Sequence, residues 1–166
     1  KLHAADHGIN TGDVSINVEK MLARKDKIVS ELTDGISALF KSNKIAFYAG
    51  QGCLVEAGVV RVSSDDQDDQ TLTAKHVILA SGSQPVQLPG MAVDNKTIFD
   101  SSGALDFPSV PEKLGIIGAG VIGLELGSVW RRLGAEVVIL EAAESLLGSA
   151  DPMIGREAKK QFSRQG

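Results

Sequence analysis

The chain has 166 residues and a formal net charge of −4, with 43 % hydrophobic, 23 % charged and 4 % aromatic residues. This composition is ordinary for a globular protein, and the length allows a sizeable buried core. Nucleic-acid sites need basic surfaces and stacking rings, so the charge and the scarcity of aromatic residues argue against such a partner. No stretch reads as a membrane span or a signal peptide, and we expect no membrane partner and no metal site.

The first half of the chain predicts one helix followed by short strands. Apolar residues recur every three or four positions over 14–40, which indicates a long amphipathic helix. Runs of β-type residues separated by turns then predict an antiparallel meander. These runs cover residues 45–49, 54–56, 59–63 and 70–74. Residues 76–80 are almost continuously apolar, as is typical of a strand buried on both faces. The single cysteine, Cys53, lies among the strands and is expected to be a buried, inert thiol.

The second half predicts alternating strands and helices after an irregular, proline-containing connector over 83–111. The expected elements are a strand at 114–117, a helix at 121–133, a strand at 137–141 and a helix at 152–164. Asp151 is a natural N-cap for the last helix, and Pro152 is a natural first residue. The chain ends where a further strand would begin, so we expect it to be a piece of a longer protein.

A dinucleotide-binding pattern, G-x-G-x-x-G, is formed by Gly118, Ala119, Gly120, Val121, Ile122 and Gly123. The pattern alone is weak, and a glycine-rich turn that binds nothing is the alternative. Here a strand precedes it, a helix follows it, and Glu141 ends the next strand at the usual spacing of about 20 residues. The glycines would allow the tight turn, the approach of a pyrophosphate to the backbone, and close packing of helix and strand. Glu141 would bind ribose hydroxyls and repel a 2′-phosphate, which favours NAD over NADP.

Two further features are ambiguous by themselves. Glu125 lies in the first turns of the predicted helix, where an acidic residue is stabilising whether or not a ligand binds. The string Ala80, Ser81, Gly82 and Ser83 ends the apolar run at 76–80. Its small residues would let a ligand approach the backbone, although a simple exit from a strand into a loop is the favoured explanation when the string is taken alone.

Taken together, these strings resemble the pyridine nucleotide–disulfide oxidoreductases, and among them most closely the dihydrolipoamide dehydrogenases. The similarity is strongest in residues 21–41, 77–90 and 116–141. It implies an α/β fold with parts of two Rossmann-like domains and an antiparallel β-meander. Residues 1–108 would be the later part of an FAD-binding domain, which contains the long helix, the meander, a return strand and the connector. Residues 109–166 would be the first part of an NAD-binding domain.

The resemblance also implies cofactor contacts. FAD would contact Gly52 and the Ala80–Ser83 string; NAD would contact Gly118–Gly123 and Glu141, with Glu125 near the nicotinamide. The family's FAD fingerprint, its redox cysteine pair and its C-terminal dimer domain with a His–Glu pair have no counterpart in this chain. We therefore expect it to contain no catalytic residue and to be inactive alone.

The complete enzyme implied by the resemblance oxidises protein-bound dihydrolipoamide with NAD⁺, through FAD and a redox disulfide. Its partner would be the lipoyl-bearing component of a 2-oxoacid dehydrogenase complex or of the glycine cleavage system. It would be a homodimer in the bacterial cytoplasm or, in a eukaryote, the mitochondrial matrix. Two alternatives stay open: another flavin disulfide reductase, of mercuric or glutathione type, and a stand-alone NAD-binding module.

Overall fold

The chain divides into two compact units. The computed structural model describes residues 5–9, 12–65 and 67–166. One unit comprises Asp26–Gln84, and the other combines Lys1–Lys25 with Pro85–Gly166. The long helix α1 (Val18–Ser42) begins in the second of these and ends in the first. It starts four residues later than predicted because the side chain of Asn17 caps it, accepting a hydrogen bond from the N–H of Lys20 at 2.8 Å.

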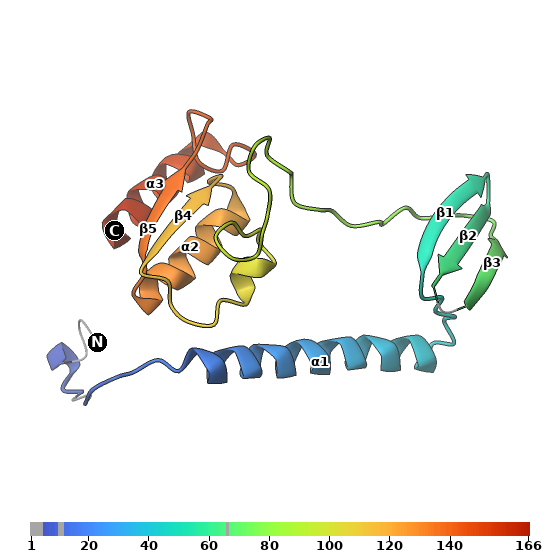
Figure 1. Cartoon of the computed structure of the whole chain (residues 1–166), viewed down its shortest axis with the longest axis horizontal. Helices are drawn as coiled ribbons and strands as arrows, with labels where there is room; N and C mark the ends of the chain where they lie inside the picture. The colour runs from blue at the N-terminus through green and yellow to red at the C-terminus, as the bar shows by residue number, and fades with distance from the viewer. Residues whose placement is uncertain (1–4, 10–11, 66) are drawn as a thin grey trace. The chain divides into compact units, whose positions relative to one another are not determined.

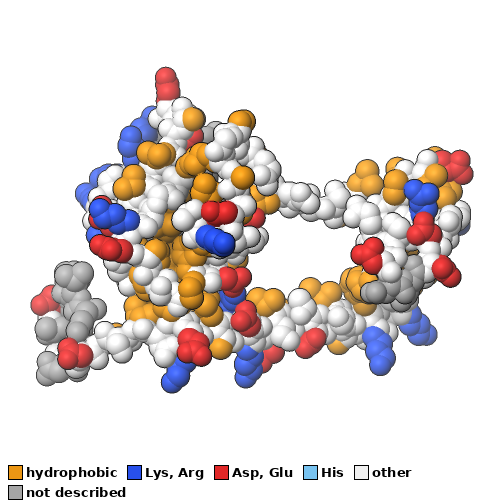
Figure 2. Space-filling model, in the orientation of Figure 1, with side chains coloured by type: hydrophobic (Ala, Val, Ile, Leu, Met, Phe, Trp, Pro, Cys, Tyr) orange, Lys and Arg blue, Asp and Glu red, His pale blue; other side chains and the backbone are white. Residues whose placement is uncertain are grey.

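The unit Asp26–Gln84 contains the predicted antiparallel meander (Figure 1). Its strands are β1 (Gln51–Glu56), β2 (Val59–Ser64) and β3 (Gln67–Thr73), hydrogen-bonded in that order. The run at 45–49, predicted as a first strand, forms none. Apolar side chains of α1 are exposed in this unit, as Figure 2 shows along the helix, with Leu32 at 65 % and Leu39 at 61 % exposure.

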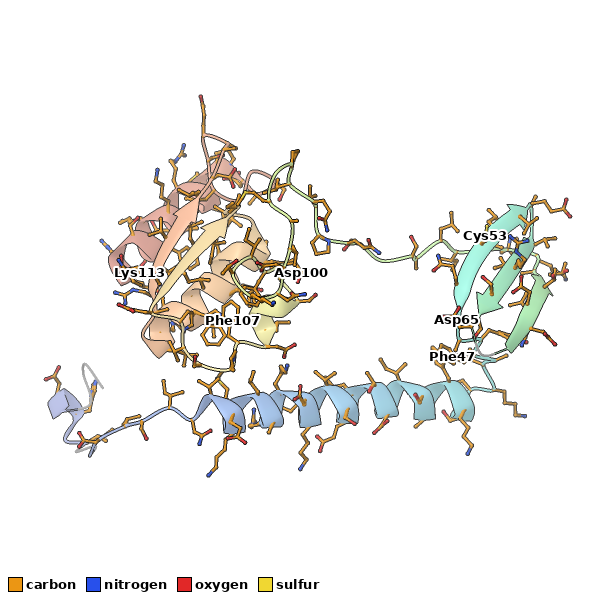
Figure 3. The ribbon with its side chains drawn as sticks, viewed as in Figure 1. Phe47, Cys53, Asp65, Asp100, Phe107 and Lys113 are labelled. Carbon is orange, nitrogen blue, oxygen red and sulfur yellow. The ribbon has the colours of Figure 1, made fainter. Side chains whose placement is uncertain are left out.

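Two expectations for this unit are wrong. Residues 76–80, predicted as a buried return strand, form no strand, and Ile78 is 90 % exposed. Cys53, expected to be buried, lies exposed on β1, all of whose residues are exposed (Figure 3). In both cases the apolar pattern indicates a segment suited to burial, but burial needs a covering or pairing segment. No strand among the described residues pairs with 76–80.

The unit that ends at Gly166 has the predicted alternation of strands and helices. Its main elements are β4 (Lys113–Ile117), α2 (Val121–Leu133), β5 (Glu136–Leu140) and α3 (Pro152–Gln165). Short 3-10 turns form at Ala5–His7 and Gly103–Leu105. The strands β4 and β5 pair in parallel, with Leu114 opposite Val137. The side chain of Asp151 caps α3 as predicted, accepting a hydrogen bond from the N–H of Met153 at 2.7 Å.

An aromatic core joins the connector to α2. Phe107, Trp130 and Ala135 are buried together, and the rings of Phe107 and Trp130 lie 5.1 Å apart, with Phe107 against α2 (Figure 3). The indole N–H of Trp130 donates to the carbonyl oxygen of Ala104 at 3.1 Å. These contacts attach the end of the connector to α2, and residues 85–108 belong to the same unit as the C-terminal segment. The assignment of residues 1–108 and 109–166 to two cofactor domains stays a prediction.

Replacing Trp130 with Phe tests this core. We expect Trp130→Phe to lower the free energy of unfolding by about 2 kcal/mol, because a smaller ring leaves a void and the Ala104 carbonyl loses its donor. Denaturation followed by far-ultraviolet circular dichroism measures the change. The control is Val129→Ala, since the neighbouring Val129 is 48 % exposed and its truncation should cost under about 0.5 kcal/mol. Equal stabilities of the two variants would contradict the assignment of this core.

Candidate functional site

A glycine bend, residues 118–120, connects the end of β4 to the start of α2. Gly118 has φ +103°, a left-handed conformation that favours glycine, and its N–H donates to the carbonyl oxygen of Leu140 at 2.8 Å. Gly120 is the N-cap of α2 and supplies no side-chain cap, and a Cβ placed there would meet no atom within 4 Å. The backbone at the start of α2 is therefore open to an approaching group, with the helix N–H groups directed toward it.

The third glycine of the pattern has a packing role. A Cβ at Gly123 would lie 2.2 Å from the carbonyl oxygen of Gly118 and 3.2 Å from a methyl group of Ile116. No side chain fits at that distance, so the first turn of α2 can lie against the end of β4 only with glycine at this position. This geometry agrees with the role that the sequence analysis gave the third glycine, which is to allow close packing of helix and strand.

Glu141 lies beside the glycine bend. It follows β5 directly, and one carboxylate oxygen accepts the N–H of Ala119 at 2.7 Å while the other accepts the N–H of Ala143 at 2.8 Å. These two hydrogen bonds hold the pKa of the Glu141 carboxyl below its usual range, and the bond from the N–H of Ala143 has the larger effect. The structure thus places a charged, solvent-exposed carboxylate at the bend.

The loop after β5 adds a contact that the sequence analysis missed. The carbonyl oxygen of Ala119 accepts the N–H of Leu147 at 3.2 Å, and Leu147 has φ +54°. A left-handed conformation is uncommon for leucine, and the neighbouring Gly148 would have been the expected residue to adopt it. No local sequence signal points to Leu147.

The remaining candidates fall into two places. Val121, Ile122 and Glu125 lie on the first turns of α2, all exposed to solvent. Gly52 lies in β1, and the Ala80–Ser83 string is exposed and irregular. The structure therefore gathers Gly118–Gly123 and Glu141 around one bend, whereas the candidates for FAD contact belong to the unit Asp26–Gln84.

Neither a cluster of metal-ligating side chains nor a membrane-crossing helix occurs within the described ranges. Those residues include no group of three or more His, Cys, Asp or Glu side chains placed to hold a metal ion. None of the helices found in them combines the length and apolar character needed to cross a bilayer.

Comparisons with known proteins agree on one family. The family model described as pyridine nucleotide-disulphide oxidoreductase matches residues 3–166. Dihydrolipoyl dehydrogenase of Cupriavidus necator is 52 % identical over 164 residues, which cover 99 % of this chain and 34 % of that protein. The mitochondrial dihydrolipoyl dehydrogenase of Pisum sativum is 40 % identical over 162 residues, or 98 % of this chain and 32 % of that protein. The chain thus spans about a third of the length of these relatives.

A solved structure supports the same fold. LpdA from Mycobacterium tuberculosis superposes with a TM-score of 0.85 at 22 % identity, covering 99 % of this chain and 36 % of that one. The fold class is accordingly α/β, with parts of Rossmann-like FAD- and NAD-binding domains and an antiparallel meander. Since the family model covers nearly every residue, the chain belongs to the pyridine nucleotide-disulphide oxidoreductase family.

Proposed function

We propose that the glycine bend and Glu141 hold NAD⁺, and that the chain forms part of a dihydrolipoyl dehydrogenase. The observation that carries the proposal is the 2.7 Å hydrogen bond between Glu141 and the N–H of Ala119, because it keeps an acidic acceptor beside the bend. The residues present fit a dinucleotide. Open space at Gly120 accommodates a pyrophosphate, and the carboxylate accepts hydrogen bonds from the adenosine ribose.

Each part of the site has a binding role in this proposal. The backbone of Gly118–Gly123 receives the pyrophosphate, and Glu125 orients the nicotinamide half from α2. Gly52 and the Ala80–Ser83 string contact FAD. NAD⁺ and FAD, when bound, supply the hydride and electron transfer, while the residues of this chain bind and orient them.

The activity proposed for the whole protein is oxidation of dihydrolipoamide with NAD⁺. The 52 % identity to a dihydrolipoyl dehydrogenase supports this activity over that of a mercuric or glutathione-type reductase. The acidic Glu141 also disfavours NADP-dependent reductases, since a 2′-phosphate would meet a negative charge. The partner of the whole protein is then the lipoyl-bearing component of a 2-oxoacid dehydrogenase complex or of the glycine cleavage system. The protein acts as a homodimer, in a bacterial cytoplasm or a mitochondrial matrix.

Substitution of Glu141 tests the proposed NAD⁺ site. We expect Glu141→Gln to weaken NAD⁺ binding about tenfold, because ribose hydroxyls donate more strongly to a carboxylate than to an amide. Isothermal titration calorimetry of the purified protein measures the affinity. Glu144→Gln is the matched control, since Glu144 is an exposed glutamate in the loop that follows Glu141. Unchanged affinity in Glu141→Gln would remove Glu141 from the site.

The pH dependence of binding gives a second test. The pKa of Glu141 is lowered, so its carboxylate stays charged until the pH falls below the ordinary glutamate value of about 4.3. The ratio of the NAD⁺ affinity of the wild-type protein to that of Glu141→Gln should therefore stay constant from about pH 7 to pH 5 and decline only in stronger acid. NAD⁺ titrations of both proteins across this range measure it. A ratio that declines already near pH 6 would show that the carboxylate is not stabilised in its charged form.

Activity of the 166-residue chain itself is a third test. We expect no reduction of NAD⁺ by dihydrolipoamide, because the only thiol is Cys53 and an internal redox disulfide needs two. Absorbance at the NADH band records the reaction, with a complete dihydrolipoyl dehydrogenase as the positive control. Turnover by the purified chain would mean that its active site has been placed wrongly.

A further inference from the structure

Residues after β4 are tied by hydrogen bonds to the end of β5 and the loop that follows it. Leu140 accepts the N–H of Gly118 at 2.8 Å, and Glu141 accepts the N–H of Ala119 at 2.7 Å. Leu147 donates its N–H to the carbonyl oxygen of Ala119 at 3.2 Å. Ala119 is only 1 % exposed, so water has little access to replace these bonds. The peptide groups on both sides of Ala119 are therefore held by one short stretch of chain, residues 140–147.

Leu147 is held in its unusual conformation by its surroundings. A leucine with φ +54° stores backbone strain, which persists only where neighbouring contacts fix it. Besides the bond to Ala119, the carbonyl oxygen of Leu147 accepts the N–H of Ala150 at 2.7 Å. The helix α3 lies directly against the preceding residue, because a Cβ at the buried Gly155 would come within 2.8 Å of the carbonyl oxygen of Leu146. A close contact of α3 thus supports the loop that reaches the bend.

We propose that Leu147, supported by Gly155, is a positioning residue that sets the selectivity of the dinucleotide site. Its N–H holds the carbonyl oxygen of Ala119, and the N–H of Ala119 holds the carboxylate of Glu141. A carboxylate held in one place binds a ribose that has its 2′-hydroxyl more tightly than a ribose that lacks it. A carboxylate that moves with a loose loop gives a smaller difference in affinity. This inference rests on the proposed function, in which Glu141 binds the adenosine ribose.

A pair of substitutions at Leu147 tests the proposal. Leu147→Pro removes the N–H and cannot adopt the left-handed conformation, while Leu147→Gly keeps the N–H and adopts it without strain. The probes are NAD⁺ and its analogue that lacks the adenosine 2′-hydroxyl, titrated calorimetrically into the purified protein. We expect Leu147→Pro to weaken NAD⁺ binding about tenfold and to reduce the preference for NAD⁺ over the analogue. Leu147→Gly should restore both to within about twofold of the wild type.

A second pair keeps the test valid if Leu147→Pro does not fold. Gly155→Ala pushes the Leu146 carbonyl from α3 without touching the bend, and we expect about a fivefold loss of the same preference. Gly148→Ala is the control, because a Cβ there meets no atom within 4 Å. The preference of Gly148→Ala for NAD⁺ over the analogue should equal that of the wild-type protein.

The outcomes separate the inference from the proposed function. If Leu147→Pro or Gly155→Ala weakens both ligands equally, the residue acts on stability alone and the inference is wrong. Unchanged binding in those variants would overturn it too. A wild-type protein that binds no NAD⁺ would instead overturn the proposed function, and the positioning role with it.

Discussion

The hydrogen bond between the Ala119 N–H and the Glu141 carboxylate is the contact on which the site depends. It forms because β4 and β5 are parallel, so that the chain leaves both strands at the same edge of the sheet. The glycine bend and the acidic residue are 22 residues apart in sequence at this contact, yet the strand pairing brings them together. The positive end of the α2 dipole lies at the same edge and favours negative charge there.

Steric limits at the bend and packing at the other end of α2 hold this arrangement. Gly123 lets the helix lie against β4, since any side chain there would overlap the Gly118 carbonyl. Toward its C-terminal end, Trp130 packs on Phe107 and donates a hydrogen bond to Ala104, which ties the helix to the connector. Both ends of α2 are thus fixed by contacts with residues outside the helix, and its N–H groups keep a defined direction.

Much apolar surface stays exposed in the described residues. On the sheet face opposite α2, Ile117 is 55 % and Leu140 is 61 % exposed, while the alternate residues of β4 and β5 are half-buried. Parallel sheets are ordinarily covered on both faces. The curated relatives are about three times as long as this chain.

The sequence by itself determined those features that depend on nearby residues. The glycine pattern defined the start of α2, and Asp151 caps α3 as predicted. The spacing of Gly118–Gly123 and Glu141 defined the bend and its acidic neighbour. The tertiary structure decided what depends on distant partners. Residues 76–80 have a strand's composition but no pairing strand among those described, Cys53 lies on an uncovered sheet, and Leu147 is held left-handed by contacts with Ala119 and Ala150. Burial, strand pairing and strained backbone are properties of what a segment packs against, and local sequence does not specify that.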